Sequence, residues 1–146
     1  MTHIKNTSTI QYSAQQMYHL VNDIESYPEF LPWCKTARIE KSDEHSMTAT
    51  LEISKGPVNS AFTTKNTLQP HSKIILDLVN GPFKKLQGIW EFSPLNSEDS
   101  CRISFQVEFS FNNLPMQLIL QPMMKLIAEN MLNAFIDRAE KIYGKN

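Results

Sequence analysis

The sequence predicts an α+β protein in which a curved antiparallel sheet of seven strands wraps around one long C-terminal helix. Several segments between residues 35 and 112 alternate apolar and polar side chains, which is typical of half-buried strands. The final segment, 115–143, instead repeats apolar residues at helical spacing, and Gly144 follows as a stop signal. A helix of this kind needs an apolar partner, and the sheet supplies one.

The N-terminal part of the chain predicts one strand and two short helices. Residues 4–12 are polar and rich in threonine, which favours an edge strand. Ser13 followed by Gln16 is a capping-box pattern, so we expect a helix from there to about Asn22. The stretch Asp23–Cys34 holds two prolines among large apolar side chains, which predicts a short helical turn packed into the core.

Six further strands should follow, joined by short turns rich in glycine, proline and serine. Short connections make neighbouring strands antiparallel. A strongly curved sheet around a helix leaves a cavity between them, and we expect one domain over residues 1–146. The six expected strands are 35–42, 47–54, 58–69, 73–80, 86–93 and 103–112.

The C-terminal helix carries one apolar stripe, with a kink or restart expected at Pro122 because proline lacks a backbone donor. Arg138 falls near the centre of this stripe. Two interpretations stay open for it: the stem lies on the core while the head reaches the rim or a carboxylate, or the guanidinium contacts a carbonyl oxygen of a bound ligand. The stripe consists of Met124, Ile127, Ala128, Met131, Phe135, Ala139 and Ile142.

Composition and charge argue against several functions. The chain has 146 residues, 41% of them hydrophobic and 20% charged. Its net charge of −1 does not indicate the positively charged surface that DNA binding requires. No apolar run approaches the roughly 18 residues of a membrane span. Cys34 and Cys101 fit no metal spacing, and we expect two reduced cysteines. The N-terminus lacks a signal or transit pattern, so we expect a cytoplasmic protein.

No catalytic or phosphate-binding motif is present, and the four histidines lie in polar or turn-like contexts. The alternation places Glu52, Glu91 and Glu108 on the outer sheet face as solvated charges. We therefore expect neither an enzyme nor a metal site.

The stretch Val21-Asn-Asp-Ile-Glu-Ser-Tyr-Pro-Glu-Phe-Leu-Pro-Trp-Cys34 resembles the signature of the bacterial ribosome-association-toxin and coenzyme-Q-binding family. That family belongs to the START-like, polyketide-cyclase-related superfamily with the helix-grip fold. Further similar segments are Phe62-Thr-Thr64, Leu78-Val-Asn-Gly-Pro-Phe83, Leu86-Gln-Gly-Ile-Trp90 and Ala134-Phe-Ile-Asp-Arg-Ala139. The resemblance covers nearly the whole chain.

The resemblance implies two functions. One is a non-enzymatic carrier that binds ubiquinone (coenzyme Q) or a similar isoprenoid lipid and supports respiration. The alternative is a toxin that binds the large (50S) ribosomal subunit and blocks subunit joining and translation initiation. No cofactor is expected besides such a quinone ligand. Residues 114–120 are apolar enough for peripheral contact with the inner membrane, but also for internal packing.

Large apolar side chains facing the interior, together with Arg138, are the expected ligand-binding residues. The methionines of the helix are core residues or face a flexible isoprenoid tail. Phe83, in a turn, plugs the core or gates a pocket mouth. The complete prediction is Leu31, Trp33, Phe62, Phe83, Trp90, Phe105, Phe109, Met124, Ile127, Met131, Phe135 and Arg138.

Overall fold

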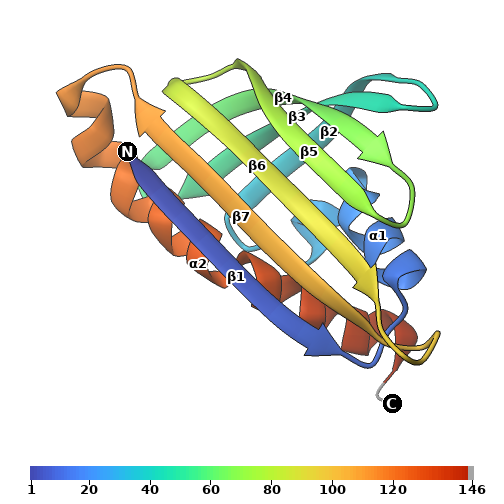
Figure 1. Ribbon diagram of the computed structural model, residues 1–146. Helices are drawn as coiled ribbons and strands as arrows, with labels where there is room; N and C mark the ends of the chain where they lie inside the picture. Colours follow the sequence, from blue (N-terminus) through green and yellow to red (C-terminus); the bar gives the residue numbers. More distant parts are fainter. Residues whose placement is uncertain (145–146) are drawn as a thin grey trace.

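A computed structural model describes residues 1–144 and shows a strongly curved sheet with one long helix along its concave face (Figure 1). The elements are β1 (Thr2–Ile10), α1 (Ala14–Asn22), the 3-10 helix η1 (Ile24–Glu29), β2 (Cys34–Ser42), β3 (Ser46–Lys55), β4 (Val58–Gln69), β5 (Lys73–Asn80), β6 (Phe83–Pro94), β7 (Cys101–Phe111) and α2 (Leu114–Tyr143).

The seven strands form one antiparallel sheet in the order β1-β7-β6-β5-β4-β3-β2. Strands β2 to β7 follow one another as hairpins, and β1 pairs with β7, so β1 lies at an edge as predicted. The predicted fold, with two short helices after the first strand and a long C-terminal helix, is confirmed. The first strand begins two residues earlier than expected, at Thr2, and ends at Ile10.

Both major helices begin with the caps that their sequences predict or allow. At α1, Ser13 Oγ accepts from the Gln16 amide (3.0 Å) and Gln16 Oε1 accepts from the Ser13 amide (2.9 Å). At α2, Asn113 Oδ1 accepts from the Met116 amide at 2.9 Å. These caps fix where each helix enters the fold.

Helix α2 continues through Pro122 without a break, so the restart expected there is wrong. Its buried face largely follows the predicted stripe, but Ile142 is 52% exposed, because it lies in an open groove between α1 and the last turns of α2. Met131 is half-buried. The buried residues of α2 are Leu120, Met123, Met124, Ile127, Ala128, Leu132, Phe135 and Ala139.

Aromatic rings join the helix to the rest of the core. Phe135 is fully buried, and its ring meets the rings of Trp90 at 5.2 Å and Tyr27 at 5.3 Å, both edge-to-face. Such contacts contribute about 0.5–1.5 kcal/mol each beyond area burial. They place the middle of α2 over the centre of the sheet.

Candidate functional site

A cavity of about 90 Å³ lies between the concave face of the sheet and α2. Side chains from β3 to β7, α1, η1 and α2 line it, which is the location expected from a curved sheet around a helix. The main apolar lining residues are Ile24, Trp33, Leu51, Ile53, Phe62, Ile74, Leu76, Leu86, Trp90, Phe105, Val107, Phe109, Met124, Ile127, Met131 and Phe135.

Small residues keep the cavity open. Gly88 points into it from β6, between Leu86 and Trp90, and a Cβ there would lie 3.2 Å from the Leu76 Cδ1 atom. Ala49 on β3 and Ala128 on α2 also line the cavity, and both are buried. Larger side chains at these positions would fill the space.

Aromatic side chains form one wall. The Trp90 ring lies 4.5 Å from that of Phe105. Trp33 and Phe62 are half-buried and contribute to the same lining. Both tryptophans of the chain therefore border the cavity.

Three polar side chains interrupt the apolar lining. Asn66 is 2% exposed, and its Oδ1 accepts from the Thr64 hydroxyl at 2.7 Å, which leaves the Asn66 amide nitrogen as the group able to donate to a ligand. Asn22 Oδ1 is buried at the cavity without a hydrogen-bond partner among the described residues. A buried oxygen without a partner is costly, at about 1–3 kcal/mol.

Sequence reasoning missed these polar residues. The signal was present: with Phe62 facing inward, the period of two along β4 also turns Thr64, Asn66 and Leu68 inward. Asn22 could not be found in this way because it ends α1, where the chain leaves the helical period.

Three buried titratable side chains of the core are held neutral, and one of them, Tyr27, lines the cavity. Tyr27 donates its hydroxyl to the Val21 carbonyl, and burial raises the pKa of this tyrosine. Burial also raises the pKa of Cys34 and of Cys101 to about 11 each, and the two cysteines form no disulfide within the described residues. No carboxylate, histidine or lysine of the described residues lines the cavity.

Most of the predicted site residues come together around the cavity. Nine of the twelve line it: Trp33, Phe62, Trp90, Phe105, Phe109, Met124, Ile127, Met131 and Phe135. Leu31, Phe83 and Arg138 do not. Leu31 is 1% exposed and lies in the packed core just after η1, where it is covered by other side chains.

Phe83 fills the core at the end of the sheet, as one of its two interpretations predicted. It is buried, stacks on Phe111 at 5.1 Å and meets Phe62 edge-to-face at 5.7 Å. It also borders a small pocket beside the cavity, together with Pro82 and Leu120. This pocket shares Ile53, Phe62 and Met124 with the cavity lining.

Arg138 reaches away from the cavity. Its Nη2 atom lies 3.2 Å from Glu29 Oε1, and its guanidinium carbon is 4.8 Å from the centre of the Phe30 ring. Only 16% of the Arg138 side chain is exposed. This is the packing interpretation, in which the stem lies on the core and the head meets a carboxylate and an aromatic face.

Outside the cavity, residues 1–144 carry paired acidic and basic side chains on the outer face of the sheet. No group of three or more histidine, cysteine or acidic residues in this range could hold a metal ion. No helix within it has the length and apolar character needed to cross a membrane. The three predicted surface glutamates each face a lysine, the closest pair being Lys85 and Glu108 at 2.8 Å.

The helix gripped by a curved sheet, with an apolar cavity between them, defines a START-like protein of the helix-grip class. Solved structures agree. The ZhuI aromatase/cyclase from Streptomyces has a TM-score of 0.84 at 15% identity over 99% of both chains. A START superfamily protein from Mycobacterium smegmatis has a TM-score of 0.71 at 21% identity over 92% of both chains.

A family model described as "Polyketide cyclase / dehydrase and lipid transport" matches residues 10–136, and the chain belongs to this family. The ribosome association toxin RatA of Escherichia coli K12 is 46% identical over 144 residues, covering 99% of this chain and 90% of that protein. The mitochondrial coenzyme Q-binding protein COQ10 of Drosophila melanogaster is 30% identical over 138 residues, covering 92% of this chain and 57% of that protein.

These relatives are named as a toxin or as a coenzyme Q-binding protein, whereas the fold is shared with an aromatase/cyclase. The resemblance inferred from the sequence motifs is thereby confirmed at the level of family and fold.

Proposed function

We propose that this protein is a non-enzymatic carrier that encloses an isoprenoid quinone, such as ubiquinone, between the sheet and α2. The observation that carries the proposal is the enclosed cavity, whose lining is apolar except at a few positions. Burial of apolar ligand surface there would contribute about 25 cal/mol per Å². The coenzyme Q-binding relative, at 30% identity, supports the same class of ligand.

The cavity must enlarge to take a quinone ring. Its volume of about 90 Å³ is below the roughly 150 Å³ of an engineered cavity that holds benzene. Met124 and Met131 line it from α2, and unbranched methionine side chains change rotamer at low cost. The small pocket beside Phe83 adjoins the cavity, and the space would extend toward it.

Asn66 would orient the head group. Its amide nitrogen can donate to a quinone carbonyl, because Thr64 already occupies its oxygen. Asn22, whose side-chain oxygen has no hydrogen-bond partner within residues 1–144, would gain one from a ligand hydroxyl or, after rotation of its amide, from a ligand carbonyl. Arg138 takes no part in this proposal, because its guanidinium is directed to Glu29.

The cavity favours binding over catalysis. General acid–base chemistry needs a positioned group that titrates near neutral pH. Within the described residues, the lining offers instead a buried tyrosine with a raised pKa and the amide and hydroxyl groups of Asn22, Thr64 and Asn66. Such groups can orient a ligand without transferring its protons.

Titration with a short-tail ubiquinone tests the proposal. Trp33 and Trp90 line the cavity, so a bound quinone should quench their fluorescence in a saturable manner. Arg138→Met leaves the lining unchanged and should be quenched like wild type, whereas Ala128→Leu fills the cavity and should abolish quenching. Equal quenching in wild type and Ala128→Leu would contradict binding in this cavity.

A second candidate function is association with the large ribosomal subunit, blocking subunit joining and translation initiation in the bacterial cytoplasm. The relative named as a ribosome association toxin, at 46% identity over nearly the whole chain, favours it. Sucrose-gradient sedimentation of a lysate tests it: the protein should migrate with the large subunit. The two functions are compatible, since one uses the cavity and the other the outer surface.

A further inference from the structure

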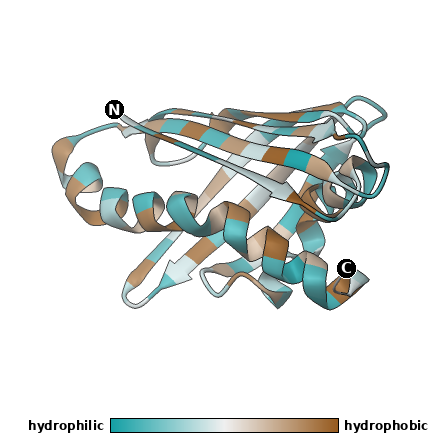
Figure 2. Ribbon diagram, turned by 60° about the horizontal axis from the view of Figure 1, so that its bottom comes forward, coloured by the Kyte–Doolittle hydropathy of each residue, from teal (hydrophilic) through white to brown (hydrophobic). Residues whose placement is uncertain are grey.

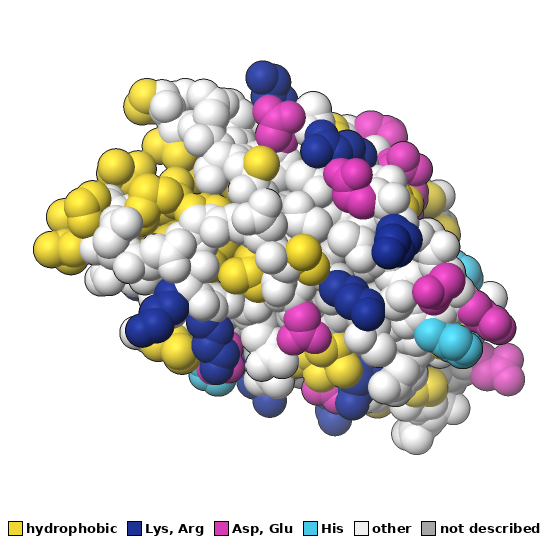
Figure 3. Space-filling view, turned by 90° about the horizontal axis from the view of Figure 1, so that it is seen from above, with side chains coloured by type: hydrophobic (Ala, Val, Ile, Leu, Met, Phe, Trp, Pro, Cys, Tyr) yellow, Lys and Arg dark blue, Asp and Glu magenta, His cyan; other side chains and the backbone are white. Residues whose placement is uncertain are grey.

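The start of α2 exposes an apolar surface that the carrier function does not use. We call Leu114, Leu118 and Ile119 the apolar tip; their exposed fractions are 62%, 68% and 57%. Figure 3 shows hydrophobic side chains gathered at this end of the molecule, with basic side chains beside them. Contiguous exposed apolar surface of this kind marks an interaction site more often than chance exposure does.

The apolar tip projects from the fold on an anchored helix. Between Leu114 and Pro122, a range that the structure describes in full, Leu120 alone is buried. The Gln121 amide nitrogen donates to the Thr2 hydroxyl at 3.0 Å, which ties the second turn of α2 to β1. Figures 1 and 2 show the first turns of α2 extending past the end of the sheet.

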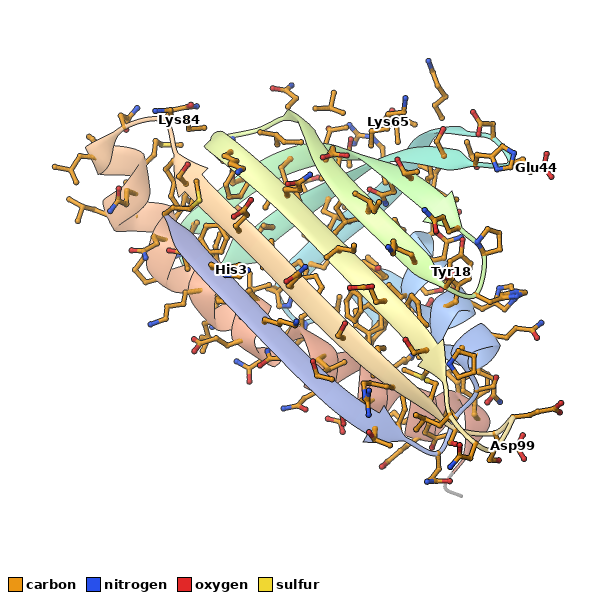
Figure 4. All side chains as sticks on the ribbon, in the orientation of Figure 1. His3, Tyr18, Glu44, Lys65, Lys84 and Asp99 are labelled. Atoms are coloured by element: carbon orange, nitrogen blue, oxygen red, sulfur yellow. The ribbon has the colours of Figure 1, made fainter. Side chains whose placement is uncertain are left out.

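The turns around the apolar tip are basic. Segments 55–60, 79–85 and 112–125 contain four lysines and no aspartate or glutamate. Lys85 pairs with Glu108, while Lys55, Lys84 and Lys125 form no ion pair with any described residue. Figure 4 shows Lys84 beside the start of α2. The end of the molecule therefore combines aliphatic side chains with unpaired positive charge.

A small pocket next to the cavity lies at the same end. It is bordered by Ser60 of β4, Pro82 of the β5–β6 turn, and Leu120 and Met123 of α2. Three residues that border this pocket also line the cavity. The apolar tip, the basic turns and the pocket beside the cavity thus share one end of the molecule.

We propose that this end docks on the surface of an anionic lipid bilayer, with the apolar tip inserted at the interface and Lys55, Lys84 and Lys125 at the head groups. Aliphatic side chains flanked by lysines are the composition of interfacial helices. Ribosomal RNA also attracts lysine, but single-stranded RNA surfaces are held through aromatic stacking, which leucine and isoleucine cannot provide. The aliphatic tip therefore favours a bilayer.

Docking at this end would let an apolar ligand pass between bilayer and cavity without crossing water. This consequence rests on the proposed carrier function; the docking itself does not. Binding to vesicles that contain no quinone measures the docking alone, because no ligand enters the cavity. Such vesicles therefore distinguish a failure of the docking proposal from a failure of the carrier function.

Vesicle flotation tests the proposal with the full-length protein. Wild type should float with vesicles of phosphatidylcholine and phosphatidylglycerol, and less with phosphatidylcholine alone or at high salt. Leu118→Asp combined with Ile119→Asp should lower the bound fraction about tenfold or more. Lys84→Ala should lower binding to anionic vesicles about fivefold. These positions are exposed, so the variants should fold as wild type does.

Ile142→Asp is the matched control, because Ile142 is an equally exposed aliphatic residue of the same helix, about 36 Å from Leu118. It should bind vesicles like wild type. Wild type that binds no vesicle, or a double variant that floats unchanged, would overturn the proposal. Loss of large-subunit co-sedimentation in the double variant, without vesicle binding by wild type, would instead assign the surface to the ribosome.

Discussion

Filling the cavity should stabilise the protein while removing its ligand. Ala128 faces the cavity from α2, so Ala128→Leu adds three carbon atoms to a helix position without losing helix propensity. At about 24 cal/mol per Å³, an empty volume of about 90 Å³ destabilises the fold by roughly 2 kcal/mol. Burial of three methylene equivalents at about 0.8 kcal/mol each gives a similar upper limit.

Equilibrium unfolding in urea, followed by tryptophan fluorescence, measures the effect. With a slope of about 1–3 kcal/mol per molar urea, the midpoint of Ala128→Leu should rise by up to about 2 M. Ala139→Leu is the matched control, because Ala139 is fully buried on the same helix but does not line the cavity. Overpacking there should lower stability by about 1–3 kcal/mol.

The two variants separate a cavity from tight packing. If Ala128→Leu is destabilised as much as Ala139→Leu, no usable space exists beside Ala128 and the reasoning is refuted. If it is stabilised but still retains quinone, the ligand binds elsewhere. We expect Ala128→Leu to be more stable than wild type and to lose quinone binding. Binding sites commonly show this trade-off between stability and function.

Three further results are expected. The double variant Thr64→Val with Asn66→Leu removes both partners of one hydrogen bond and leaves neither group unsatisfied, so the free energy of unfolding should change by less than about 1 kcal/mol. Quinone affinity, measured by fluorescence titration, should fall by about tenfold. Arg138→Met keeps the buried aliphatic part of the side chain, so it should lower the free energy of unfolding in urea by about 0.5–1 kcal/mol and leave quinone affinity unchanged. A loss of quinone affinity would show instead that Arg138 contributes to ligand binding. Burial raises the thiol pKa of Cys34 and Cys101 from 9.0 to about 11, so the native state binds more protons than the unfolded state between these two values. The free energy of unfolding should therefore be constant below about pH 9 and decrease toward pH 11. The decrease should be smaller when both cysteines are replaced by alanine.

Local sequence patterns predicted most of the fold. Alternation located the strands, and the Ser13–Gln16 box located the first helix, because these signals depend on neighbours along the chain. The restart expected at Pro122 is absent, because helix α2 runs through this proline as one element and carries a buried face from Met123 onward. Tertiary contacts outweighed the local penalty there.

The site was predictable only in part. The identity of the apolar lining followed from which strand face points inward, and nine of twelve expected residues line the cavity. Arg138 was placed correctly on the helix, but its partner Glu29 comes from η1, more than a hundred residues away in sequence. Cavity volume depends on sheet curvature and side-chain rotamers, which no sequence pattern encodes. The exposure of Leu118 likewise depends on where the sheet ends.

Native mass spectrometry with organic extraction, on protein purified gently from a quinone-producing bacterium, tests the carrier function most directly. Wild type should carry ubiquinone or menaquinone at up to one molecule per chain, and Ala128→Leu, purified in parallel, should carry none. Wild-type protein that is empty as purified, and still empty after incubation with short-tail quinone, would contradict the carrier function and leave ribosome association as the function to pursue.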